Sequence, residues 1–134
     1  MLESDIRITD GKVPLSFPGY TIIIPKHSSK QLARMLVLVK DELVESMSIL
    51  DDISTPNFPS VWLSFQSKTN AKITLGLFYR LWKDQQSTTS ISNQQERLEI
   101  FLDQMRRAVA TGNHVVISGD ANLDCNKYDD CYHL

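Results

Sequence analysis

The sequence predicts a single domain of the α/β (α+β) class. Residues 60–79 alternate between apolar and polar positions, as the strands of a β-hairpin do, and residues 92–120 indicate an amphipathic helix followed by a short apolar strand. A strand, a helix and a further strand in succession form the crossover unit of a sheet that is covered by helices. We therefore favour this class over an all-helical bundle.

Length and composition describe an ordinary globular chain. The 134 residues are 42% hydrophobic and 22% charged, and the net charge is −2. These values argue against collagen, a coiled coil or wholesale disorder. A chain of this length buries roughly two-thirds of the surface that its unfolded form exposes, which is enough for one core. Because acidic and basic residues nearly balance, any basic surface for nucleic acid must be local.

The first elements that the sequence predicts are a strand and an ambiguous segment. Residues 19–24 form a β-branched run between two prolines, which predicts a short buried strand. Over residues 30–50 the apolar residues share one helical face, whereas the run at 35–39 also suits a buried strand; periodicity alone favours the helix. Two prolines then predict a turn at residues 56–59.

The hairpin follows this turn. Polar residues 67–70 separate two alternating runs and predict the turn between the strands. On each run, alternate apolar side chains point to one face of the sheet. These side chains are Val61, Leu63 and Phe65 on the first run and Ile73, Leu75, Leu77 and Tyr79 on the second.

An amphipathic helix and a strand complete the chain of predicted elements. Ser92 and Gln95 have the spacing of a capping box at the start of the helix, and Gly112 marks its end. Residues 114–120 form a short apolar strand that ends in Gly-Asp. The apolar face of the helix is predicted to comprise Leu98, Phe101, Leu102, Met105 and Val109.

Candidate site residues lie where the two predicted sheet strands end, at residues 77–80 and 117–122. If these strands are neighbours, Tyr79, Asp120 and Asn122 share one rim. An aspartate can orient and deprotonate a water, and a tyrosine hydroxyl or an asparagine amide can hydrogen-bond a phosphate without adding negative charge. The alternative is that residues 120–122 are only a structural turn and Tyr79 only a core edge.

The two cysteines, Cys125 and Cys131, lie near the C-terminus together with His133. A metal site there would lack a fourth ligand at a recognised spacing. Two cysteines in an intracellular chain are most often free thiols, so we expect neither a disulfide nor a metal site.

We expect an intracellular protein with no membrane partner. The longest apolar run, residues 35–39, is far shorter than the roughly 20 residues that cross a bilayer. Acidic residues Glu3 and Asp5 stand where a signal peptide has a basic start.

Four segments of the chain resemble known motifs. Residues 118–124 read Ser-Gly-Asp-Ala-Asn-Leu-Asp, residues 76–80 read Gly-Leu-Phe-Tyr-Arg, residues 19–22 read Gly-Tyr-Thr-Ile and residues 2–6 read Leu-Glu-Ser-Asp-Ile. In turn, they resemble the Gly-Asp-Phe-Asn motif, a strand ending in Tyr-Arg, a Pro-Gly-Tyr segment and a short motif with a metal-binding glutamate. The family with these motifs in this order is the endonuclease/exonuclease/phosphatase superfamily, and the likeness is greatest to the endonuclease domain of non-LTR retrotransposons.

This resemblance implies a fold and an activity. The fold would be a fragment of a four-layered α/β sandwich, with mixed β-sheets flanked by helices. A strand would cover residues 34–40, which overrules the helical interpretation of residues 35–39. The activity would be Mg²⁺- or Mn²⁺-dependent hydrolysis of DNA phosphodiesters. A partner would be the remainder of the same domain or a reverse transcriptase domain.

The resemblance also implies a role for each of four residues. Glu3 would ligate the cation, and Tyr79 would contact the scissile phosphate. Asp120 would position the attacking water, and Asn122 would hold the phosphate. The implied catalytic residues are therefore Asp120, Asn122 and Tyr79, with Glu3 as the metal ligand.

The chain departs from the family pattern in three ways. Ala121 replaces the usual aromatic residue, which is a packing change. A strand with a catalytic asparagine does not precede Glu3, and a second aspartate and a Ser-Asp-His motif do not follow Asp120; His133 has no Ser-Asp before it. We therefore expect residues 1–134 to form one domain truncated at both ends and inactive alone. The alternatives are a non-catalytic α/β interaction module and a phosphatase of the same superfamily.

Overall fold

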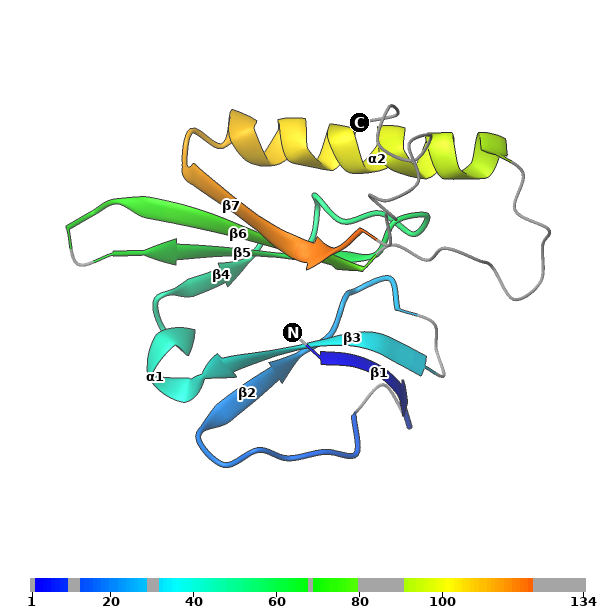
Figure 1. Cartoon of the computed structure of the whole chain (residues 1–134). Coiled ribbons are helices and arrows are strands. Elements are labelled where there is room, and N and C mark those ends of the chain that lie inside the picture. The colour runs from blue at the N-terminus through cyan, green and yellow to red at the C-terminus, as the bar shows by residue number, and fades with distance from the viewer. Residues whose placement is uncertain (1, 10–12, 29–31, 68, 80–90, 122–134) are drawn as a thin grey trace.

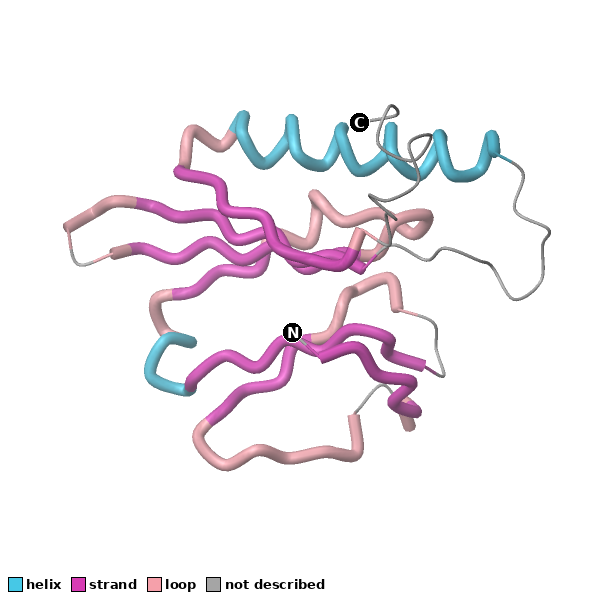
Figure 2. Tube along the Cα trace, in the orientation of Figure 1, coloured by secondary structure: helices cyan, strands magenta, loops and turns pink. Residues whose placement is uncertain are grey.

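The protein forms three layers, which are a three-stranded sheet, a four-stranded sheet and a long helix (Figure 1). A computed structural model describes residues 2–9, 13–28, 32–67, 69–79 and 91–121. Figure 2 shows the two sheets facing each other, with the helix on the far side of the larger sheet. The predicted α/β (α+β) class is therefore confirmed.

The three-stranded sheet is antiparallel and has the order β1-β3-β2. Its strands are β1 (Leu2–Arg7), β2 (Tyr20–Ile23) and β3 (Leu32–Lys40). The strand implied over residues 34–40 is confirmed, and the helical interpretation of this segment is wrong. Leu36 explains the ambiguity, because it is only 1% exposed although it lies on the face opposite Met35. A strand buried on both faces loses the two-residue alternation by which strands are recognised.

The prediction of a buried strand at residues 19–24 is half wrong. The segment does form β2, but β2 is an edge strand on which Tyr20 and Thr21 are exposed and Ile23 alone is fully buried. Its β-branched residues therefore stabilise an extended edge rather than a core strand.

The four-stranded sheet has the order β4-β5-β6-β7. Its strands are β4 (Met47–Ile49), β5 (Ser60–Gln66), β6 (Lys72–Tyr79) and β7 (His114–Asp120). The predicted hairpin is confirmed as β5 and β6, which pair in register from Ser60 opposite Phe78 to Gln66 opposite Lys72. The predicted crossover is confirmed as well, because β7 pairs with β6 in parallel.

Residues 41–50 do not continue a helix. They form only the single turn α1 (Asp41–Val44) and then β4, neither of which the sequence predicts. Strand β4 has three residues, two of them exposed, so its pattern is too short to be recognised.

The two sheets pack around one apolar cluster. Inward-facing side chains of the smaller sheet meet the alternate residues that were predicted to share one face of the hairpin. Burial of this apolar surface is the main force that holds the sheets together. The buried members are Ile23, Met35, Val37 and Val39 from the smaller sheet and Val61, Leu63 and Leu77 from the larger one.

The helix α2 (Ile91–Ala110) covers the other face of the four-stranded sheet. It begins at Ile91, so Ser92 is a helical residue and the predicted capping box is wrong at this boundary. The predicted stop is confirmed: the Gly112 amide donates to the Val109 carbonyl oxygen at 3.0 Å, and Gly112 has a φ of 73°. A positive φ of this size favours glycine at the end of a helix.

The buried face of α2 differs from the predicted one at its centre. Gln104 and Ala108 have no exposed surface, whereas Val109 is 62% exposed. Val109 is therefore wrongly predicted as a core residue. Gln104 can lie on the buried face because its polar side chain is fully hydrogen-bonded inside the protein.

Candidate functional site

The parallel pairing of β6 and β7 brings two of the predicted site residues together. Tyr79 lies directly opposite Asp120, at the carboxyl ends of the two strands. Tyr79 packs against the apolar cluster between the sheets, and side chains alternate along each strand, so both residues lie on the sheet face that is turned toward the smaller sheet. We call these two residues the carboxyl edge. Asp120 is half-buried there.

Glu3 lies on the facing sheet. Its backbone pairs opposite Met35 on β3, and Met35 belongs to the same apolar cluster that Tyr79 contacts. Figure 1 shows that β3 begins at the end of the sandwich where β6 and β7 finish. The register between β1 and β3 shifts between Glu3 and Ile6. The fold thus brings the strand of Glu3 toward the carboxyl edge.

Several predicted residues lie outside the described part of the chain. They are Arg80, Asn122, Cys125, Cys131 and His133. The structure therefore relates Tyr79, Asp120 and the backbone of Glu3 to one another, and the role of Asn122 stays a prediction.

The backbones of β6 and β7 approach closely at Phe78 and Gly119, next to the carboxyl edge. A Cβ atom on Gly119 would lie 2.2 Å from the Phe78 carbonyl oxygen and 2.6 Å from Cδ1 of its ring. Gly119 precedes Asp120 and Phe78 precedes Tyr79, so the contact lies one residue from the candidate site on both strands. Only glycine leaves room for β7 at this position.

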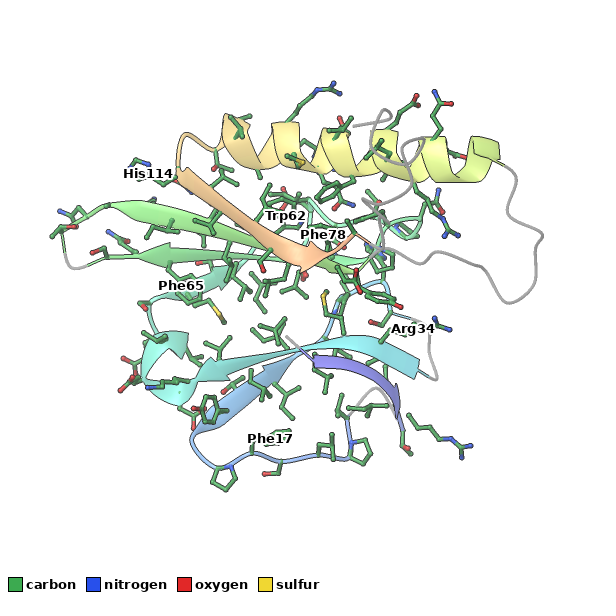
Figure 3. All side chains as sticks on the ribbon, in the orientation of Figure 1. Phe17, Arg34, Trp62, Phe65, Phe78 and His114 are labelled. Carbon is green, nitrogen blue, oxygen red and sulfur yellow. The ribbon has the colours of Figure 1, made fainter. Side chains whose placement is uncertain are left out.

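Three phenylalanine rings pack between the sheet and α2 beneath this contact. Phe78 is 4.4 Å from Phe101 and 6.0 Å from Phe58 between ring centroids, and Phe58 is 5.0 Å from Phe101. Figure 3 shows Phe78 and Trp62 between the four-stranded sheet and α2. Clustered aromatic rings at these distances stabilise one another beyond simple burial.

Gln104 is a buried polar residue between α2 and the four-stranded sheet that the sequence pattern did not predict. Its side chain makes four hydrogen bonds, to Thr55, Phe58, Ser60 and Trp62. The available signal was a polar residue three positions after Phe101 on the buried side of an amphipathic helix. Hydrophobic periodicity assigns a polar residue to the solvent-facing side of a helix, so it does not predict a buried hydrogen-bond network.

The carboxyl edge has the donor chemistry that a hard divalent cation requires. Mg²⁺ is bound in proteins through one or two carboxylates, with water and substrate oxygens completing its shell. Asp120 offers one carboxylate, and Glu3 would offer the second. Among the side chains that the structure describes, no three His, Cys, Asp or Glu residues form a metal-holding group. Asp120 is the one candidate ligand of this pair whose side chain the structure describes.

Histidine does not complete the carboxyl edge from β7. His114 begins this strand and pairs opposite Ile73, so it lies at the other end of the sheet (Figure 3). An imidazole that could protonate a leaving group is therefore not supplied by the strand that carries Asp120.

A second surface feature lies on the outer face of the smaller sheet. Residues of the 13–17 segment and of the 20–24 segment line an open groove of about 410 Å³, whose accessible surface is more polar than apolar. Phe17, at the lower side of the view in Figure 3, and Tyr20 contribute the aromatic surface. None of the described residues that line the groove carries a charged side chain.

Within the described ranges, no helix has both the length and the apolar character that a membrane crossing requires. The expected intracellular location stays a prediction.

Comparisons with known proteins do not assign the chain to a family. No protein-family model, curated protein or solved structure matches the chain.

Proposed function

We propose that the carboxyl edge is part of a divalent-metal-dependent site for phosphodiester hydrolysis. The observation that carries this proposal is the in-register pairing of Tyr79 with Asp120 at the ends of two parallel strands. Ligand sites of α/β sheets form at the carboxyl ends of strands, where side chains leave the core. The motif resemblance supports DNA as the substrate and a retrotransposon-type endonuclease as the origin of the domain.

Each residue would have a distinct part in the reaction. The Asp120 carboxylate would orient a water and accept its proton as the water oxygen bonds to phosphorus. The Tyr79 hydroxyl would donate a hydrogen bond to a phosphate oxygen, and the Asn122 amide would hold a second one. Glu3 and one oxygen of the Asp120 carboxylate would hold Mg²⁺, which when bound would neutralise charge on the phosphoryl oxygens, and the other Asp120 oxygen would face the attacking water.

We expect the isolated chain to be inactive or nearly so. The departing oxygen needs a proton, and β7 provides no histidine at the carboxyl edge. Completion of the site would fall to the rest of the domain in a larger protein, with a reverse transcriptase domain as a further partner. Competition between diester and monoester substrates would distinguish this activity from a phosphatase that uses the same edge.

Metal affinity tests the proposal without requiring turnover. Asp120→Asn and Glu3→Gln should each weaken Mn²⁺ binding by about tenfold or more, because each removes one of two carboxylate ligands. Free Mn²⁺ is measured by its electron paramagnetic resonance signal during titration of the purified chain. Glu99→Gln is the matched control, since Glu99 is an exposed residue of α2. Equal Mn²⁺ affinity of the wild-type chain and Asp120→Asn would contradict the proposal.

The second candidate is a non-catalytic interaction module. The open groove beside Phe17 and Tyr20 favours it, because aromatic side chains are enriched in protein–protein interfaces. Under this alternative, Mn²⁺ affinity would be insensitive to Asp120→Asn and to Glu3→Gln in a chain that remains folded.

A further inference from the structure

We propose that Gln104 is a positioning residue for the carboxyl edge and acts through Phe58 and Phe78. The inference rests on the proposed function only in treating the carboxyl edge as the site. The chain of contacts is a separate observation. It runs from the buried amide of α2 through a turn and an aromatic cluster to the backbone that precedes Tyr79 and Asp120.

The first link joins Gln104 to the turn at residues 55–58. Its Nε2 donates to the Thr55 Oγ1 at 3.0 Å and to the Phe58 carbonyl oxygen at 2.9 Å. The Phe58 amide in turn donates to the Thr55 carbonyl oxygen at 3.2 Å. One side-chain amide therefore holds both ends of the turn, which fixes the position of the Phe58 backbone.

The other half of the Gln104 amide is anchored to β5. Its Oε1 accepts from the Ser60 Oγ at 2.7 Å and from the Trp62 Nε1 at 3.3 Å. Gln104, Ser60 and Trp62 are all buried, so any bond lost here leaves a polar group without water. With all four hydrogen bonds made, the amide has one orientation, which makes it suited to positioning.

The second link is the packing of Phe58 in the aromatic cluster. Its ring stacks on Phe101 with an interplanar angle of 27° and lies 6.0 Å from Phe78. Phe101 also contacts Phe78, with 4.4 Å between the ring centroids. A shift of the Phe58 backbone therefore moves the rings that fix Phe78.

The third link is the contact of Phe78 with Gly119, which lies next to the candidate site. The Phe78 ring and carbonyl occupy the space beside Gly119, so the two strands meet there without clearance. Tyr79 and Asp120 are the next residues on the two strands. Movement of Phe78 would therefore change the separation and orientation of the carboxyl edge.

Gln104→Met tests this chain of contacts because it keeps the length of the side chain and removes all four hydrogen bonds. We expect the amide hydrogen exchange of residues 117–120 to accelerate about tenfold, since local opening governs exchange. Mn²⁺ affinity should fall by about tenfold, the effect typical of losing a residue that orients a metal ligand.

Two controls separate positioning from general destabilisation. Val37→Ala trims the core between the sheets, away from α2, and lowers global stability without touching the chain of contacts. Gln95→Met makes the same chemical change at an exposed position of α2. Should Gln104→Met fail to fold, Phe58→Leu keeps the Gln104 hydrogen bonds and trims only the second link, with the same local effects expected at smaller size.

The outcomes distinguish the two proposals. Acceleration at residues 117–120 beyond that in Val37→Ala supports the positioning role, even if the wild-type chain binds no Mn²⁺ and the proposed function fails. If Mn²⁺ binds at Asp120 but Gln104→Met and Phe58→Leu match Val37→Ala in exchange and in affinity, the positioning role is overturned and the proposed function stands.

Discussion

Gly119→Ala should destabilise the protein by about 3 kcal/mol, at the upper end of the cost of overpacking a core. The added Cβ would lie 2.2 Å from the Phe78 carbonyl oxygen, and backbone on a paired strand cannot move aside as a flexible side chain does. The strands would separate at their carboxyl ends, so the variant should also lose Mn²⁺ affinity. Urea unfolding followed by tryptophan fluorescence measures the stability.

Gly112→Ala is the control for this prediction. Gly112 has a positive φ of 73°, but a Cβ there meets nothing within 4 Å. Its substitution should cost about 1 kcal/mol from backbone strain alone and leave Mn²⁺ affinity unchanged. Equal destabilisation by the two alanines would show that the approach of Gly119 to Phe78 is not as close as described.

Gly76→Ala should destabilise by about 2–3 kcal/mol for a related reason. A Cβ at this position would lie 2.4 Å from Cζ3 of Trp62, its direct neighbour across β5 and β6. The indole is only 1% exposed and its Nε1 donates to the Ser60 Oγ at 2.9 Å, so it cannot rotate away without losing that bond.

A double-mutant cycle isolates this contact. Trp62→Leu alone should cost about 3 kcal/mol, because it leaves a cavity and unpaired polar groups. In that background Gly76→Ala should cost about 1–2 kcal/mol less than in the wild-type chain, since the ring that it would strike is gone. Additive free energies of unfolding would mean that Trp62 does not cover Gly76.

The hairpin and the crossover could be predicted from the sequence because both depend on local patterns. β5 and β6 each have one face toward the core, so alternation reveals them. Consecutive strands of a sheet are usually neighbours, and two strands joined by a helical crossover run in parallel. The carboxyl ends of β6 and β7 could therefore be expected at one edge of the sheet, with Tyr79 and Asp120 close together. This half of the candidate site followed from the order of elements alone.

The remaining half depends on contacts between distant residues. The pairing of β1 with β3 joins segments about thirty residues apart in the chain, and no local period encodes such pairing or its register shift between Glu3 and Ile6. The position of α2 was mispredicted at Val109 because hydrophobic periodicity treats Gln104 as exposed. Buried polar networks are specified by the geometry of several elements together, so they emerge only from the folded structure.

The location of a bound Mn²⁺ ion shows whether the carboxyl edge is a metal site. Paramagnetic broadening of assigned backbone amide signals at low Mn²⁺ concentration reports which residues lie near the ion. We predict that the amides of Tyr79, Asp120 and the β1 residues around Glu3 broaden first and together, and that this pattern is lost in Asp120→Asn. Broadening confined to the exposed acidic residues near α1, at Asp41, Glu42 and Glu45, with the carboxyl edge unaffected, would contradict it.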